Sequence, residues 1–198
     1  MMRSHQVYSL LAAAALSAAS AHAATIVTFA DPAMGPDTPL FVVNTMTNQL
    51  TGGWTDIGLT LETPGLAAPN FANARFTMSA VTLTSPLPFA TLGPGQIDFW
   101  DSSNNPLMTI TFSGGLLTSS FGFGASEFQG NSVTFSGPIL GGDVLTDESF
   151  AFSFANPVAT ATGYQATASF TSSATIPAPA GLGAMAMGGL MIGRRRRS

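Results

Sequence analysis

The sequence of 198 residues contains no cysteine and no lysine, and its two histidines, His5 and His22, lie near the N-terminus. Without cysteine the chain forms neither disulfides nor thiolate metal sites. If the first 23 residues are removed, no histidine remains either. A Ser-His-Asp triad, a Cys-His pair and a Ser-Lys dyad are then excluded. A phosphate-binding loop that depends on lysine is excluded for the same reason.

Charged residues are also scarce, at 8% of the chain, compared with about 25% in an average soluble protein. Arg3 lies near the N-terminus, four arginines form a C-terminal cluster, and Arg75 is the only cation between them. All ten acidic residues lie in this middle part, which therefore has a formal charge of −9, one arginine against ten carboxylates. Because such a charge repels polyanions, we expect no nucleic-acid partner.

The first 23 residues have the parts of a secretion signal peptide. A short basic start precedes an apolar stretch over about 7–19, and Ala21 and Ala23 place small residues at the end. The apolar stretch is too short for a comfortable membrane span. We predict export through the Sec translocon and cleavage by signal peptidase between Ala23 and Ala24. An uncleaved anchor helix is the alternative.

Residues 176–198 form a tail with three parts. A proline-containing beginning is followed by an apolar stretch over 180–193 and by an arginine cluster at 194–197. The 14 apolar-stretch residues would form a helix of about 21 Å, shorter than the ~30 Å hydrocarbon core of a bilayer. Cations beyond a hydrophobic segment favour the cytoplasmic side. We therefore expect this short hydrophobic helix to anchor the chain transiently in the inner membrane.

The order of these parts resembles a known sorting signal. The tail begins with Ile176, Pro177, Ala178, Pro179 and Ala180, and its cluster comprises Arg194, Arg195, Arg196 and Arg197. It resembles the PEP-CTERM signal of Gram-negative bacteria, with Ala178 where the Val-Pro-Glu-Pro motif has glutamate. It is also similar to a sister class with the motif Val-Pro-Leu-Pro-Ala. The resemblance implies an exosortase-type transpeptidase as partner, and display at the cell surface or in an exopolysaccharide matrix. A plain C-terminal anchor is the alternative.

Between residues 24 and 171 apolar and polar residues alternate with a period of two, which predicts an all-β domain. The alternating segments are 57–62, 76–83, 108–113, 132–136, 150–154 and 164–171. Within 76–83 the apolar parity changes near Ala80, which indicates a bulge or bend. Turn signals such as Gly52-Gly53 separate the segments. The number and spacing of the strands indicate an antiparallel sandwich, jelly roll or barrel, and we expect an antiparallel β-sandwich or jelly roll, followed by a linker at 172–175.

One predicted strand has the features of a binding site. Ile97 and Phe99 share one face, expected to point inward, so that Asp98 and Trp100 fall on the opposite face. An outward tryptophan can stack on a sugar ring while a neighbouring carboxylate bonds its hydroxyls. Trp54 is a second candidate for such a contact. Burial of either tryptophan under a loop or a sheet partner is the alternative.

Acidic residues offer two further kinds of site. Paired carboxylates hydrolyse glycosidic bonds, and Asp98 with Asp101 is the nearest pair in the sequence, with Glu62 or Glu127 as other partners. Oxygen ligands also bind calcium. The weak candidates for calcium are Asp98 with Asp101, and the group Asp143, Asp147 and Glu148, none of which matches an EF-hand loop. Solvated surface acids are the ordinary interpretation of both groups.

These observations predict an exported structural or glycan-binding protein without catalytic residues, a required cofactor or a metal. A carboxylate-based glycoside hydrolase that acts on exopolysaccharide is the alternative.

Overall fold

The computed structural model describes residues 22–35, 37–85, 89–118 and 126–177. Most of the predicted signal peptide and sorting tail, including the arginine cluster, therefore lies outside the described residues. In the part of the chain that is described, no helix has the length and apolar character needed to cross a bilayer.

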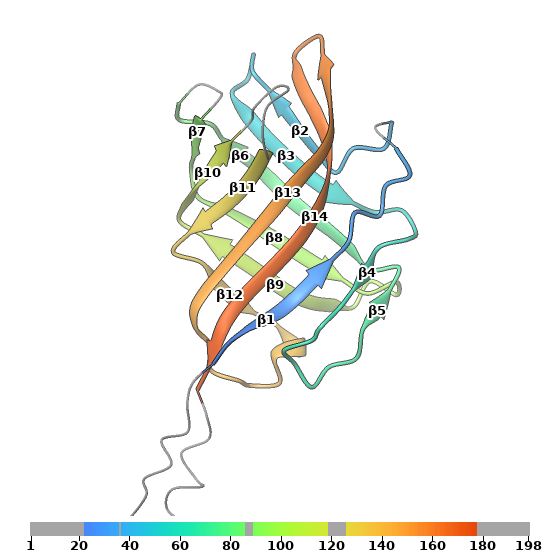
Figure 1. The fold of residues 1–198 in the computed structure, drawn as a ribbon, viewed down its shortest axis with the longest axis vertical. Helices are drawn as coiled ribbons and strands as arrows, with labels where there is room; N and C mark the ends of the chain where they lie inside the picture. Colours follow the sequence, from blue (N-terminus) through green and yellow to red (C-terminus); the bar gives the residue numbers. More distant parts are fainter. Residues whose placement is uncertain (1–21, 36, 86–88, 119–125, 178–198) are drawn as a thin grey trace, which may run out of the picture. The chain divides into compact units, whose positions relative to one another are not determined.

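Almost every described element is an antiparallel strand, as the alternating sequence predicts (Figure 1). The strands are β1 (His22–Phe29), β2 (Phe41–Asn44), β3 (Gln49–Trp54), β4 (Thr60–Leu61), β5 (Phe71–Ala72), β6 (Arg75–Thr82), β7 (Phe89–Leu92), β8 (Gly95–Trp100), β9 (Pro106–Phe112), β10 (Gly114–Thr118), β11 (Ser126–Asn131), β12 (Thr134–Ser136), β13 (Thr146–Thr160) and β14 (Gly163–Ile176), with one 3-10 turn at Pro138–Leu140. The main sheet has the order β12-β9-β8-β6-β3-β2-β14-β13-β11-β10-β7, with β1 also paired to β14. Strands β4 and β5 form a separate ribbon.

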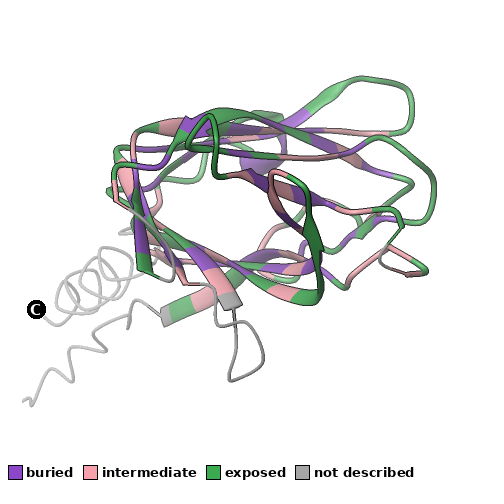
Figure 2. Cartoon of the chain, turned by 90° about the horizontal axis from the view of Figure 1, so that it is seen from above, coloured by how far each residue is buried: buried purple, intermediate pink, exposed green. Residues whose placement is uncertain are grey.

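The main sheet curls, so that strands far apart in this order, such as β6 and β7, lie next to each other. Leu83, directly after β6, forms a bridge with Leu92 of β7, and the ribbon viewed from above surrounds an interior (Figure 2). Neighbouring strands in a sheet are rotated relative to one another, and this twist accumulates along long strands such as β13 and β14. The predicted all-β antiparallel class is confirmed. The two separately hydrogen-bonded sheets of a sandwich or jelly roll are not seen among the described strands, because the main sheet is continuous.

Phenylalanine side chains fill the interior of the curled sheet. The largest fully buried side chains include Phe29, Phe41, Phe76, Phe99, Phe128 and Phe152. The ring of Phe152 lies 4.8 Å, centroid to centroid, from those of Phe41 and Phe170, and stacks on Phe128 at 5.9 Å. Rings in such contact stabilise a core by about 0.5–1.5 kcal/mol per pair beyond the area that they bury.

The predicted bulge near Ala80 is confirmed. Leu50 of β3 pairs with Val81, whereas Gly52 pairs with Met78, so β6 has one more residue than β3 at this point. Met78 and Val81 are both buried, and Ala80 between them is exposed. The extra residue therefore lets both apolar side chains face the core although their positions differ in parity.

One other local prediction was wrong, and one is confirmed only in part. Gly52 and Gly53 lie inside β3 and not in a turn. A Cβ atom on Gly52 would lie 2.7 Å from Cδ1 of Phe41, so this glycine makes room for a core ring.

The alternation predicted over 57–62 is confirmed in part. Leu59 and Leu61 are buried while Thr60 and Glu62 are exposed, as the pattern predicts. However, only Thr60 and Leu61 form a strand, and Ile57 is 74% exposed.

The predicted linker at 172–175 is also wrong, because these residues belong to β14. Ser172 and Ala174 are buried inside the domain. The strand continues to Ile176, which is the register partner of His22 at the start of β1. The first residue of the predicted sorting motif is therefore the last residue of the sheet.

Candidate glycan-binding face

The outer face of β8 presents the two side chains that the alternation places there. Ile97 and Phe99 are buried in the core, while Asp98 and Trp100 are half-buried on the other face. The predicted orientation is confirmed. It arises because β8, which pairs with β6 and β9, is pleated, so that alternate side chains point to the core-facing inner surface and to the outer surface of the curled sheet.

Tertiary pairing brings further polar groups to this outer face. Arg75 of β6 is the register partner of Trp100, and Thr77 and Thr109 flank Asp98 from β6 and β9. An indole, a guanidinium, a carboxylate and two hydroxyls thus belong to two adjacent rows of one sheet surface. We define the candidate glycan-binding face, called the glycan-binding face below, by these residues, namely Arg75, Thr77, Asp98, Trp100 and Thr109.

Asp98 is held by hydrogen bonds from its own sheet. The Gln96 side-chain amide donates to both carboxylate oxygens at 2.9 Å. The Thr109 hydroxyl donates to Oδ1 at 2.7 Å. These three bonds fix the orientation of the carboxylate. Since a carboxylate offers about four acceptor positions, about one position remains for a ligand. Asp98 therefore has a fixed direction toward a ligand but little remaining acceptor capacity.

The turn after β8 positions the arginine of the face. Arg75 Nη1 donates to the Asn104 side-chain oxygen at 2.9 Å. Asn104 adopts a left-handed conformation, with φ of 63°, which asparagine tolerates better than most residues. The turn therefore holds the guanidinium beside the strand end that carries Trp100.

Asp101 organises this turn through hydrogen bonds to its carboxylate. It accepts from the Asn105 side chain at 2.8 Å and from the backbone N–H groups of Asn105 and Ser103 at 2.8 Å. The side-chain hydrogen bond from Asn105, followed by its backbone hydrogen bond, lowers the pKa of Asp101 below its ordinary value. Bonds to the charged form stabilise that form. Asp101 is therefore a structural carboxylate that stays ionised.

Trp54 does not belong to this face, which corrects its assignment as a glycan contact. Its side chain is only 8% exposed and belongs to the hydrophobic core. Its Nε1 atom is buried without a hydrogen-bond partner in the described structure. Trp54 is therefore buried, as the alternative interpretation predicts. It is the last residue of β3 and lies an even number of residues after the buried Leu50, so both side chains point to the core.

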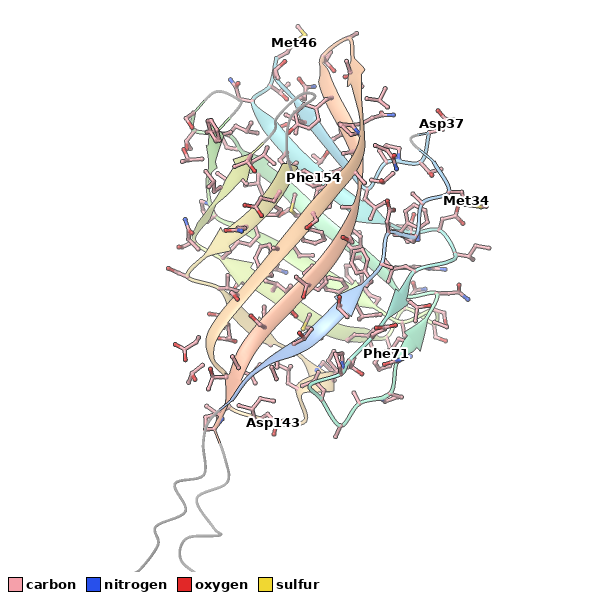
Figure 3. All side chains as sticks on the ribbon, viewed as in Figure 1. Met34, Asp37, Met46, Phe71, Asp143 and Phe154 are labelled. Carbon is pink, nitrogen blue, oxygen red and sulfur yellow. The ribbon has the colours of Figure 1, made fainter. Side chains whose placement is uncertain are left out.

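The other acidic candidates are not gathered into one site. Glu127 lies on β11 and Glu62 follows β4, and neither strand pairs with β8. Within the described ranges, no three acids or other metal-ligating side chains come together. Asp143 lies at the lower end of the domain in Figure 3. Glu148 Oε1 accepts the Phe135 backbone N–H at 2.7 Å and so fastens β13 to β12.

A shallow depression of about 210 Å³ lies elsewhere, on β11, β13 and β14. Its lining is small and uncharged, and includes Gln129, Ser149, Ala151, Thr171 and Ser173. The hydroxyls of Ser149 and Ser173 bond each other at 2.8 Å. The depression has no exposed aromatic ring or charged side chain in its lining, whereas the candidate face carries the half-buried indole of Trp100.

Sequence reasoning found Asp98 and Trp100 but missed Arg75 as a member of the face. The available signal was its isolation, since it is the only cation between the two ends of the chain. Comparison with models of protein families, with curated proteins and with solved structures finds no match to this chain.

Proposed function

We propose that this chain is an exported, non-catalytic protein of the bacterial envelope or extracellular matrix that binds polysaccharide through its glycan-binding face. The observation that carries the proposal is the placement of Trp100 and Asp98 side by side on the outer surface, with Arg75 opposite the indole. A half-buried indole stacks on the apolar face of a sugar, and the surrounding donors and acceptors bond its hydroxyls.

The state of the carboxylates favours binding over hydrolysis. Asp98 already accepts three hydrogen bonds, and Asp101 is occupied by its own turn. A glycosidase needs one carboxyl group to transfer a proton and a second on the other side of the scissile bond. Neither Glu62 nor Glu127 lies on a strand paired with β8, so the face offers no such second group from these residues.

The N-terminal end of the domain is compatible with removal of the predicted signal peptide. Cleavage between Ala23 and Ala24 would take away only the first two of the six register pairs between β1 and β14. The buried residues of β1, which are Ile26, Val27 and Phe29, would stay in place. Export and sorting themselves are inferred from the signal-like N-terminus and the PEP-CTERM-like tail.

Binding is tested with the full chain, purified in mild detergent, on a glycan array and in a reducing-sugar assay. We expect retention on at least one polysaccharide without release of reducing ends, and loss of retention in Trp100→Ala. Ser149→Ala, in the separate depression, is the matched control and should bind normally. Turnover that disappears in Asp98→Asn or Glu127→Gln would instead establish the hydrolase.

Processing is tested by mass spectrometry of the protein recovered from a Gram-negative host that encodes an exosortase-type enzyme. We expect a mature N-terminus at Ala24 and loss of the terminal arginine cluster. An intact C-terminus ending in Arg197 and Ser198 would contradict processing and reduce the tail to a plain anchor.

A further inference from the structure

We propose that the ligand of the glycan-binding face is an uncharged polysaccharide and not a polyuronate. This inference rests on the proposed function, and it concerns which of the many matrix polysaccharides the face accepts. Three features of the described residues carry it: the local charge balance, the arrangement that restrains Arg75, and the remaining hydrogen-bonding capacity of the face.

The local charge balance of the face is negative. Asp98 belongs to the face, and Asp101 follows Trp100 directly. Hydrogen bonds from Asn105 and Ser103 lower the pKa of Asp101, so it is charged at neutral pH. Arg75 supplies the one compensating cation. A polyuronate would bring a further carboxylate with every sugar, and like charges at close range oppose association.

The single cation is already engaged in the fold. Arg75 donates to Asn104 at 2.9 Å, and the main chain of Asn104 in turn donates to the Asp101 carbonyl at 3.1 Å. The bond to Asn104 holds the guanidinium in one orientation and leaves its other N–H groups for a ligand, so a sugar carboxylate in a two-point contact would have to bind it in that orientation. Such a carboxylate would also approach the strand end that carries the ionised Asp101. A basic site for uronates would need more cations than the face contains.

The remaining capacity suits hydroxyl groups. A sugar hydroxyl both donates and accepts, so one ligand group can donate to the free acceptor position of Asp98 while its neighbour accepts from Arg75. The indole of Trp100 contacts the apolar C–H face of the ring and is indifferent to charge. Neutral hexoses meet all three requirements without adding an anion.

The wider domain strengthens the discrimination at low salt. One arginine and ten carboxylates lie between residues 24 and 175, so an approaching polyanion is repelled before contact. Such repulsion between exposed charges is screened over about 8–10 Å at physiological ionic strength. Binding of a neutral polymer should therefore depend little on salt, whereas any binding of a polyuronate should strengthen as salt is added.

The experiment compares polymers that differ only at C6 of each sugar. The matched pairs are β-1,4-glucan with β-1,4-glucuronan, β-1,4-mannan with β-1,4-mannuronan, and α-1,4-galactan oligomers with α-1,4-galacturonan. Dissociation constants are measured for the full chain in mild detergent at 20 mM and 500 mM NaCl. We expect at least one neutral member to bind tenfold or more tightly than its acidic partner at 20 mM NaCl, with a smaller ratio at 500 mM.

Three variants connect this ratio to the face. Trp100→Ala should abolish neutral binding, and Asp98→Asn, which keeps the shape but not the charge, should lower the ratio. Asp37→Asn removes one exposed carboxylate at a different part of the domain (Figure 3) and should leave the ratio nearly unchanged. The salt dependence of the unmodified chain tests the same point without any substitution.

Equal or tighter binding of a polyuronate, lost in Trp100→Ala, would overturn this inference and leave the proposed function intact. Failure of every polymer to bind would overturn both. A ratio that changes as much in Asp37→Asn as in Asp98→Asn would show that overall charge, and not the face, sets the preference.

Discussion

The side chain of Ser172 forms two hydrogen bonds with the main chain of Val27. Its Oγ accepts from the Val27 N–H at 3.0 Å and donates to the Val27 carbonyl at 2.9 Å. The register between β1 and β14 shifts between Thr25 and Thr28, and Val27 lies within that shift. A buried hydroxyl thus replaces the main-chain partner that the irregularity takes away.

Ser172→Ala should leave both main-chain groups of the buried Val27 unsatisfied, which costs about 1–3 kcal/mol per buried group left without a partner. We expect the free energy of unfolding, measured by urea titration, to fall by about 2–6 kcal/mol for the two groups together. Ser173→Ala is the matched control, because Ser173 is half-buried and its hydroxyl bonds the exposed Ser149 hydroxyl and not a buried main-chain group. A loss as large in the control would contradict the assigned role.

The two tryptophans should respond in opposite ways. Trp54→Ala empties core volume and should destabilise the domain by about 3–5 kcal/mol, with unchanged glycan affinity in the fraction that folds. Trp100→Ala should cost about 1 kcal/mol of stability or less, as is usual for surface substitutions, but should abolish glycan binding. Urea unfolding and affinity electrophoresis measure the two quantities. Loss of binding in a well-folded Trp54→Phe variant would return Trp54 to the site.

Acid should destabilise the domain partly through Asp101. Hydrogen bonds from the Asn105 side chain, the Asn105 backbone and Ser103 lower the pKa of this carboxyl, although desolvation opposes them. A depressed pKa in the folded state stabilises the fold above the unfolded-state pKa of about 3.9. That stabilisation is lost as the pH falls from about 4 through the lower folded-state value.

NMR titration of the Asp101 carboxyl and urea unfolding between pH 6 and pH 2 test this prediction. Asn105→Ala removes the largest cause and should raise the pKa of Asp101 toward its ordinary value, with a shallower loss of stability below pH 4. Ser102→Ala, in the same turn, is the control. A titration of Asp101 that is identical in Asn105→Ala and the unmodified chain would disprove the assigned cause.

Gly130 should resist even a methyl group. A Cβ atom there would lie 2.7 Å from Cζ of Phe150 and 3.2 Å from Cβ of Phe112, both in the core. Overpacking of this kind costs about 1–3 kcal/mol, so Gly130→Ala should lower the urea midpoint with little change in slope. At Gly93 the nearest atom would be 3.7 Å away, and Gly93→Ala should be nearly neutral. Equal effects would show that the Phe150 ring moves aside.

The period-two pattern was sufficient for the faces of individual strands. It predicted the buried and exposed faces of β8 and the bulge near Ala80, because pleating alternates side chains whatever the partner strand is. The turn signal failed at Gly52-Gly53, where glycine is needed for the space beneath Phe41 and not for a turn. Local sequence does not distinguish these two uses of glycine.

The candidate site was predictable only in part. Asp98 and Trp100 are two residues apart, so their common face follows from the strand alone. Arg75 joins them through a register across β6 and β8, and Asp98 acquires its hydroxyl donor from β9. Such neighbours depend on which strands pair, and pairing is determined by the packing of the entire core.

Composition and the alternation of side chains along a strand are enough to predict the β class and the acidic, cation-poor character of the middle. They also exclude histidine, cysteine and lysine chemistry from residues 24–198. The continuous, curled sheet, the burial of Trp54 and the place of 172–175 in β14 became known from the fold alone. Each of these depends on contacts between segments far apart in the chain, as between Val27 and Ser172, which no local pattern records.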